Sequence, residues 1–136
     1  MRGDSTMSRK AICCCGACSI EVNGEPELNA LCHCGNCKKR TGSAFGWSAY
    51  FADGQVVGRS GDFRVYEIAG ATNQQQRWFC AACGSTLFWK VARRPRQTGI
   101  AGGCFAEPPL DPPSVTVSNH GRCDWLGLPA EWRTSL

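Results

Sequence analysis

Seven of the eleven cysteines in this chain fall into three close-set groups, and this spacing constrains the fold more than any other feature. The groups are Cys13-x-Cys15, Cys32-x-Cys34-x-x-Cys37 and Cys80-x-x-Cys83. Thiolates separated by one or two residues converge on a single soft cation, which in proteins is usually tetrahedral zinc. The spacing therefore predicts a chain held together by bound metal.

A glycine directly follows one cysteine of each group, in Cys15-Gly16, Cys34-Gly35 and Cys83-Gly84. In a tight zinc turn the residue after the ligand often needs a positive φ angle, which glycine adopts without steric cost. The repeated context favours three zinc turns over cysteines scattered through a core.

The three groups divide into one closed and one open metal site. The first and third groups each offer two sulfurs, so together they complete a four-thiolate site whose metal contributes to folding. The middle group offers three sulfurs alone, which leaves the fourth position of a tetrahedral ion to water or a ligand, as in catalytic sites. The basic run Lys38-Lys39-Arg40 would offset the negative charge of three thiolates.

Four cysteines remain outside these groups, namely Cys14, Cys18, Cys104 and Cys123. We interpret them as small buried hydrophobic residues. In the alternative interpretation, Cys104 or Cys123 is a fourth ligand or a redox nucleophile. His33 lies between two ligands and is predicted to face outward, with a proton-transfer role as the alternative.

The pattern of the rest of the chain predicts a small, mostly β domain. The 136 residues fit one domain, and 16 glycines with 7 prolines predict many turns and few long helices. Between Ala44 and Phe51 apolar side chains recur at every second residue, as in a half-buried strand. We expect antiparallel sheets stapled by zinc at residues 11–136, behind a flexible leader at residues 1–10. Further strands are expected at Ala17–Val22, Val56–Val57, Phe63–Tyr66, Arg77–Phe79, Thr86–Ala92, Thr98–Gly102 and Val115–Ser118, and short helices at Asn36–Arg40 and Pro129–Trp132.

Charge and hydropathy narrow the function classes. No segment approaches the roughly 20 apolar residues that a membrane-spanning helix needs, and residues 1–10 do not resemble a secretory signal. A cytoplasmic, reducing setting is expected, in which thiols stay free to bind metal. The formal charge of +4 is mild. We interpret Arg93–Arg96 as a solvated loop, and binding to nucleic acid is not expected.

The order of these motifs resembles the glutathione-dependent formaldehyde-activating enzyme family, which is also named for its relative centromere protein V. The resemblance rests on Cys-x-Cys-Gly-Ala from Cys13, Cys-His-Cys-x-x-Cys from Cys32 and Cys-x-x-Cys-Gly-Ser from Cys80. The segment Lys39–Phe45 and the late Trp125 also look like the family. The likeness extends from about residue 11 to residue 128.

The resemblance implies a fold of coiled β-sheets with two zinc ions. The structural ion would be held by the first and third cysteine groups, and the catalytic ion by Cys32, Cys34 and Cys37. The implied reaction is the reversible addition of glutathione to formaldehyde, giving S-hydroxymethylglutathione, which is classed with the carbon–sulfur lyases. Family members often carry a histidine where this chain has Pro113-Ser114-Val115, so the role of that histidine does not carry over.

The open position of the middle group motivates a mechanism. A substrate thiol would take that position, and zinc would lower its pKa from about 8.5 toward neutrality. The resulting sulfur nucleophile would add to a polarised aldehyde carbonyl. Ser43 is a candidate proton donor, and Phe45 and Trp47 are candidate walls of the substrate pocket. The alternative places all three residues in the core or in turns.

Two other functions remain open. A non-catalytic zinc module for a protein or nucleic-acid partner predicts two closed metal sites and salt-sensitive binding through Arg93–Arg96. An enzyme similar to a methionine sulfoxide reductase would need a catalytic cysteine outside the metal groups, such as Cys104 or Cys123.

Overall fold

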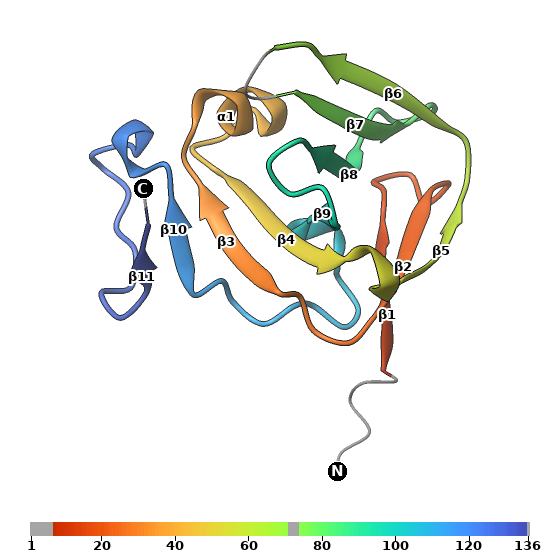
Figure 1. The fold of residues 1–136 in the computed structure, drawn as a ribbon, viewed down its shortest axis with the longest axis horizontal. Coiled ribbons are helices and arrows are strands. Elements are labelled where there is room, and N and C mark those ends of the chain that lie inside the picture. The colour runs from red at the N-terminus through yellow and green to blue at the C-terminus, as the bar shows by residue number, and fades with distance from the viewer. Residues whose placement is uncertain (1–6, 71–73, 136) are drawn as a thin grey trace.

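The computed structural model describes residues 7–70 and 74–135, and within these ranges the protein is mostly β, with two sheets and one short α-helix (Figure 1). The mostly β fold was expected from the sequence. None of the helices in the described ranges has the length and apolar character needed to cross a bilayer.

The smaller sheet has three antiparallel strands in the order β1-β2-β5. These strands are β1 (Ser8–Ile12), β2 (Ser19–Asn23) and β5 (Val56–Ser60). Because β1 begins at Ser8, the prediction that residues 8–10 belong to a flexible leader is wrong, and the rest of that leader lies outside the described residues except Met7. The missed signal is the pairing of β1 with β2, which a polar strand sequence does not reveal.

The larger sheet has eight strands in the order β11-β10-β3-β4-β9-β8-β7-β6. Figure 1 shows it curling, with β6 along the top of the view and β10 and β11 at its left side, and these strands lie at the two ends of the sheet. Its strands are β3 (Leu28–Cys32), β4 (Gly46–Ala52), β6 (Phe63–Ile68), β7 (Gln75–Cys80), β8 (Thr86–Val91), β9 (Gln97–Ala101), β10 (Val115–Val117) and β11 (Arg133–Thr134).

Strand β10 departs from the expected antiparallel pattern, because it pairs in parallel with both β3 and β11. Parallel neighbours need a long connection, since the chain must return to the same end of the sheet. The proline-rich segment before β10 supplies that return in this protein. It thereby places β10 beside the strand that carries Cys32.

The core lies where the two sheets face each other. Ile20 of β2, Phe51 of β4 and Phe88 of β8 are completely buried there. Burying a large apolar side chain stabilises a fold by roughly 1.5–3 kcal/mol. The predicted alternation in β4 holds, since Ala49 and Phe51 are both buried. The residues of β4 that alternate with Ala49 and Phe51 therefore belong to the face directed away from the core.

The single α-helix, α1 (Gly35–Thr41), matches the helix expected at Asn36–Arg40. It begins after Cys34, whose extended backbone and side-chain sulfur cap the helix, and ends at Gly42, which has φ of 65°. The second expected helix, at Pro129–Trp132, is wrong: the residues there form turns. A single hydrogen bond from the Trp132 N–H to the Pro129 carbonyl closes that turn.

Candidate metal centres

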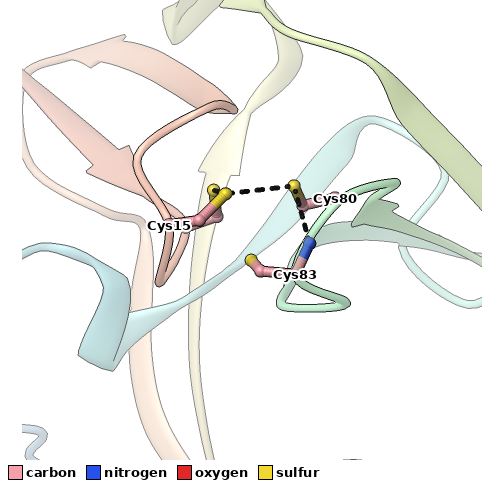
Figure 2. A group of neighbouring side chains, drawn as sticks. Cys15, Cys80 and Cys83 are labelled. Carbon is pink, nitrogen blue, oxygen red and sulfur yellow. Dashed lines mark hydrogen bonds between the residues drawn. The ribbon is translucent and has the colours of Figure 1, made fainter.

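The first cysteine centre lies where the β1–β2 turn meets the β7–β8 turn. The sulfurs of Cys13, Cys15, Cys80 and Cys83 all lie within 4.8 Å of one another. The Sγ atoms of Cys13 and Cys15 are 3.6 Å apart. Those of Cys15 and Cys80 are 3.7 Å apart, and Figure 2 shows these two residues with Cys83. Four sulfurs around tetrahedral zinc, with Zn–S bonds of about 2.3 Å, would be separated by about 3.8 Å. This centre can therefore hold a metal ion with four thiolates.

Backbone N–H groups point at these sulfurs. Cys13 Sγ accepts from the N–H of Cys18 at 3.2 Å, and Cys80 Sγ accepts from the N–H groups of Ala82 and Cys83 at 3.3 and 3.4 Å. Hydrogen bonds of this kind stabilise thiolate over thiol. Two of the predicted glycine turns are confirmed, because Gly16 and Gly84 have φ angles of 84° and 81°.

The third predicted turn is wrong, since Gly35 is the first residue of α1 and does not adopt a positive φ angle. The physical reason is that Cys34 caps a helix, so the chain after it turns with right-handed helical geometry. The cysteines of the middle group are therefore presented by a helix start and not by a tight turn.

Ser85 connects the two turns of the first centre. Its hydroxyl oxygen accepts from the backbone N–H of Cys14 at 3.1 Å and lies 3.2 Å from Cys83 Sγ. The hydroxyl and then the backbone N–H of Ser85 lower the pKa of Cys83 to about 5. Ser85 therefore favours the deprotonated sulfur that a metal requires. The motif Cys-x-x-Cys-Gly-Ser places Ser85 next to the third cysteine group, and its contact with Cys14 is a product of the fold.

The second cysteine centre lies at the junction of β3 and α1. Cys32 ends β3, Cys34 caps α1 and Cys37 belongs to its first turn. Their three sulfurs lie within 4.8 Å of one another, and no fourth histidine, cysteine or carboxylate of the described residues joins them. All three are free thiols and half-buried. This centre can hold a metal ion while leaving a coordination position open.

The thiols of the second centre differ in pKa. Hydrogen bonds from the side chains of Cys32 and Cys37 lower the pKa of Cys34 to about 2, assisted by the backbone N–H groups of Cys37 and Asn36. The same close neighbours, together with burial, raise the pKa of Cys37. Three thiolates so close repel one another, and a bound cation relieves that repulsion. The group therefore fits the requirements of a metal ion.

His33 does not face outward, and that prediction is wrong. Its side chain is completely buried, and its Nε2 lies 2.8 Å from the hydroxyl of Thr116 on β10. The backbone N–H of His33 bonds to the Val117 carbonyl, which extends the pairing of β3 with β10 and turns the imidazole inward. Burial, and then the charges of Arg122 and Lys38, lower the pKa of His33. His33 therefore anchors the segment between Cys32 and Cys34 to β10.

The interpretation of the four remaining cysteines is confirmed only in part. Cys18 is completely buried, and its thiol donates to the Asp62 carbonyl at 3.3 Å. Cys14 is exposed, because the turn directs it away from the sulfurs on either side. Cys104 and Cys123 are half-buried, and neither belongs to a cysteine centre.

A cavity of about 850 Å³ opens onto the second centre and is lined by Cys32, Cys34 and Cys37. No aspartate or glutamate of the described residues lines it. Five basic residues do, namely Lys39, Arg40, Arg77, Arg93 and Arg94. A concave site lined by one sign of charge attracts ligands of the opposite sign. The cavity therefore favours an anionic ligand.

Arg77 and Arg40 are both fixed by contacts within the protein. Arg77 is buried on β7, where its Nε donates to Gln75 Oε1 at 3.1 Å. Burial, and then the charge of Arg40, lower the pKa of Arg77. The Arg40 guanidinium stacks 4.2 Å over the ring of Trp89. Because no carboxylate of the described residues pairs with either arginine, both remain able to bind an anion.

The predicted substrate residues Ser43, Phe45 and Trp47 lie elsewhere than in this cavity lining. Ser43 is exposed just beyond α1, and Phe45 packs edge-on against His33 with ring centroids 6.2 Å apart. The indole of Trp47 donates to Asn29 Oδ1 at 2.7 Å. Their substrate contacts stay a prediction.

Strand alternation was the signal that could have found the residues lining the cavity. Ala49 and Phe51 point into the core, so Ser48 and Tyr50 belong to the opposite face of β4. Both Ser48 and Tyr50 line the cavity. The alternation that marks the buried face of β4 thus also identifies the face that lines the cavity.

Comparisons with known proteins agree with this architecture. A family model described as glutathione-dependent formaldehyde-activating enzyme matches residues 8–120. A protein of Halomonas elongata, which carries the same family name as a provisional assignment, is 28% identical over 123 residues, covering 85% of this chain and 78% of its own. A solved structure of a Rhodobacter sphaeroides protein superposes with a TM-score of 0.54 at 22% identity, covering 73% of this chain and 87% of that one. The solved structure supports the fold.

Proposed function

Because the chain belongs to the glutathione-dependent formaldehyde-activating enzyme family, we propose that it catalyses the reversible addition of glutathione to formaldehyde. The product would be S-hydroxymethylglutathione, and the reverse reaction is that of a carbon–sulfur lyase. The observation that carries the proposal is a three-sulfur centre with an open position that faces a basic cavity. A closed centre or a disulfide there would offer a thiol nothing to bind.

The two cysteine centres would hold two zinc ions with different roles. Cys32, Cys34 and Cys37 would hold the catalytic ion, and the four sulfurs of the first centre would hold a structural ion. Zinc bound at the open centre would stabilise the thiolate of an incoming thiol and polarise a carbonyl oxygen. At the first centre all four positions would be taken by protein, which suits a purely structural ion.

The positive charge of the residues lining the cavity complements the negative charge of glutathione. Glutathione carries two carboxylates and one ammonium group, and the cavity offers arginines without acidic partners. Arg77 is the best placed to receive a carboxylate, because its buried guanidinium is fixed by Gln75 and can form a bidentate pair. Binding the peptide part of the substrate there would orient its thiol toward the three sulfurs.

The proposed reaction is balanced without any redox partner. The sulfur electron pair of glutathione forms a bond to the formaldehyde carbon, and the π electrons of the carbonyl move onto oxygen. The oxygen gains one proton, and the thiol has lost one. The protein therefore has to orient the two substrates, stabilise charge on sulfur and oxygen, and pass one proton.

Replacing one sulfur of the open centre tests this function. In Cys34→Ser we expect one metal ion per chain in place of two, and adduct formation at the spontaneous rate. The matched control is Cys123→Ser, which removes a half-buried thiol outside both centres. Metal analysis, circular dichroism and exchange NMR of ¹³C-formaldehyde with glutathione give the three readouts. A folded Cys34→Ser protein that has lost one ion and still matches the wild-type rate would contradict the proposal.

The rival functions receive less support from the fold. A sulfoxide reductase needs a reactive thiolate, but burial raises the pKa of Cys104. A non-catalytic zinc module would need no open coordination position, whereas the second centre has three protein sulfurs. Both observations favour the proposed addition of glutathione to formaldehyde over these rivals.

A further inference from the structure

The hydroxyl of Tyr50, a residue that lines the cavity, has a proton with no acceptor among the described residues. Trp89 Nε1 donates a hydrogen bond to the Tyr50 oxygen at 3.2 Å. An indole N–H is only a donor, so the Tyr50 hydroxyl acts as an acceptor in this bond. No described residue accepts the phenolic proton, and Tyr50 lines the cavity together with the three cysteines. Its O–H is therefore left to donate to a ligand.

The strand register explains how Trp89 reaches Tyr50. Gly99 of β9 is the partner of Tyr50 in β4 and also the partner of Trp89 in β8. A Cβ atom at Gly99 would collide with the indole of Trp89. Because position 99 has no side chain, the indole lies across β9 and contacts the phenol two strands away. The three residues form one row across the sheet.

Two arginines hold this row in place. The guanidinium of Arg40 stacks over the Trp89 ring at 4.2 Å, and that of Arg94 lies 4.8 Å over the Tyr50 ring. Both arginines line the same cavity. Stacked cations restrict the rings and place positive charge beside the space in which an oxyanion would form. The phenol is therefore fixed before any substrate arrives.

Tyr50 also remains protonated at neutral pH. Burial is the main cause that raises its pKa, and the charges of Cys37 and Cys32 act in the same direction. The hydrogen bond from Trp89 and the charge of Arg94 oppose this increase. A protonated phenol can donate, which is the property that a developing alkoxide needs.

We propose that Tyr50 is a catalytic residue that donates its hydroxyl proton to the aldehyde oxygen, and that Trp89 is its positioning residue. This inference rests on the proposed function. As the C–S bond forms, the π electron pair of the carbonyl moves to oxygen, which takes the proton of Tyr50. The phenolate then recovers, through water, the proton that the thiol released. In the reverse direction the same residue removes the proton from the hydroxymethyl group.

Removing the hydroxyl tests the role of Tyr50 in turnover. In Tyr50→Phe we expect kcat to fall by on the order of 10²-fold, with the KM for glutathione changed little, because the ring and the arginine contacts remain. Tyr66→Phe is the matched control, since Tyr66 is exposed on β6 and outside the cavity lining. In Trp89→Phe we expect a smaller fall in kcat. The Tyr50 hydroxyl loses the hydrogen bond that orients it, but it keeps the proton that it donates.

A spectroscopic measurement distinguishes direct contact between Tyr50 and the substrates from a purely structural role of Tyr50. The chain has two tyrosines, so labelling the Tyr66→Phe protein with [¹³Cζ]tyrosine gives one resonance, that of Tyr50. In metal-loaded protein we expect this resonance to shift when glutathione and formaldehyde are added together, and to shift less with glutathione alone. An unmoved resonance, or a Tyr50→Phe protein that turns over at the wild-type rate, overturns the role of Tyr50 alone. A wild-type protein no faster than the spontaneous reaction overturns the proposed function, and the catalytic role with it.

Discussion

The two cysteine centres use the same ligand chemistry, yet the backbone presents their sulfurs differently. The first centre joins two turns, and its four sulfurs come in pairs from segments more than sixty residues apart in the chain. The second centre takes three sulfurs from one continuous segment at the junction of β3 and α1. A centre that ties distant segments together contributes to folding. A centre built from one segment has less to hold together and can leave a position open.

The surroundings of the two centres differ as well. At the first centre Cys13 and Cys80 are buried in the core cluster, whereas Cys15 and Cys83 are exposed. At the second centre all three sulfurs face a cavity with five basic residues. The number of sulfur ligands alone therefore does not assign a role to a centre. Whether the sulfurs lie at the border of the core or in a charged cavity matters as much.

The largest effect should follow from breaking the first centre. In Cys80→Ser we expect the loss of several kcal/mol of folding free energy, because a structural metal site couples ion binding to folding. Thermal unfolding followed by circular dichroism, with metal analysis, measures this effect. The matched variant is Cys34→Ser at the second centre, for which we expect only a small change in melting temperature. Equal destabilisation by both variants would break the distinction between the centres.

A moderate effect should follow from removing the cavity's buried charge. In Arg77→Gln we expect the KM for glutathione to rise about tenfold, which corresponds to about 1.4 kcal/mol, because a carboxylate loses its bidentate partner. For cysteamine, a thiol without a carboxylate, we expect little change. Arg64→Gln on β6 is the control, since Arg64 is exposed and lies outside the cavity lining. An unchanged KM for glutathione would show that the charge of Arg77 does not serve substrate binding.

The smallest effect should concern the pH at which the first centre releases its metal. The Ser85 hydroxyl lowers the pKa of Cys83 to about 5, so in Ser85→Ala that pKa rises and protons compete better with the metal. We therefore expect acid release of this ion to begin at a higher pH, by about half a unit. Metal release monitored with a chromophoric chelator measures this shift. Ser60→Ala, at an exposed position of β5, is the control, and an identical release curve for Ser85→Ala would contradict the role of Ser85.

Much of the fold was predictable because it depends on local patterns. The two-residue alternation in β4 identified its buried face, and the residues after Cys34 identified α1. Strands β1 and β3 were missed, since their stability comes from pairing with neighbours and their own sequences carry a weak signal. The helix expected at Pro129–Trp132 was wrong, because four residues cannot form a stable helix without packing to support them.

The cysteine spacing by itself determined which sulfurs converge within each group, because residues separated by one or two positions cannot lie far apart in space. The meeting of the first group with the third, about 65 residues further along the chain, depends on the fold. Spacing along the chain does not predict contacts between residues that different strands bring together. Only the tertiary structure placed His33 against Thr116, and Tyr50 beside Trp89 across Gly99. These contacts depend on strand order and register, which are set by pairing between distant segments. The three cysteine groups are thus encoded locally, whereas the four-sulfur centre and the cavity beside the second centre are decided by the whole fold.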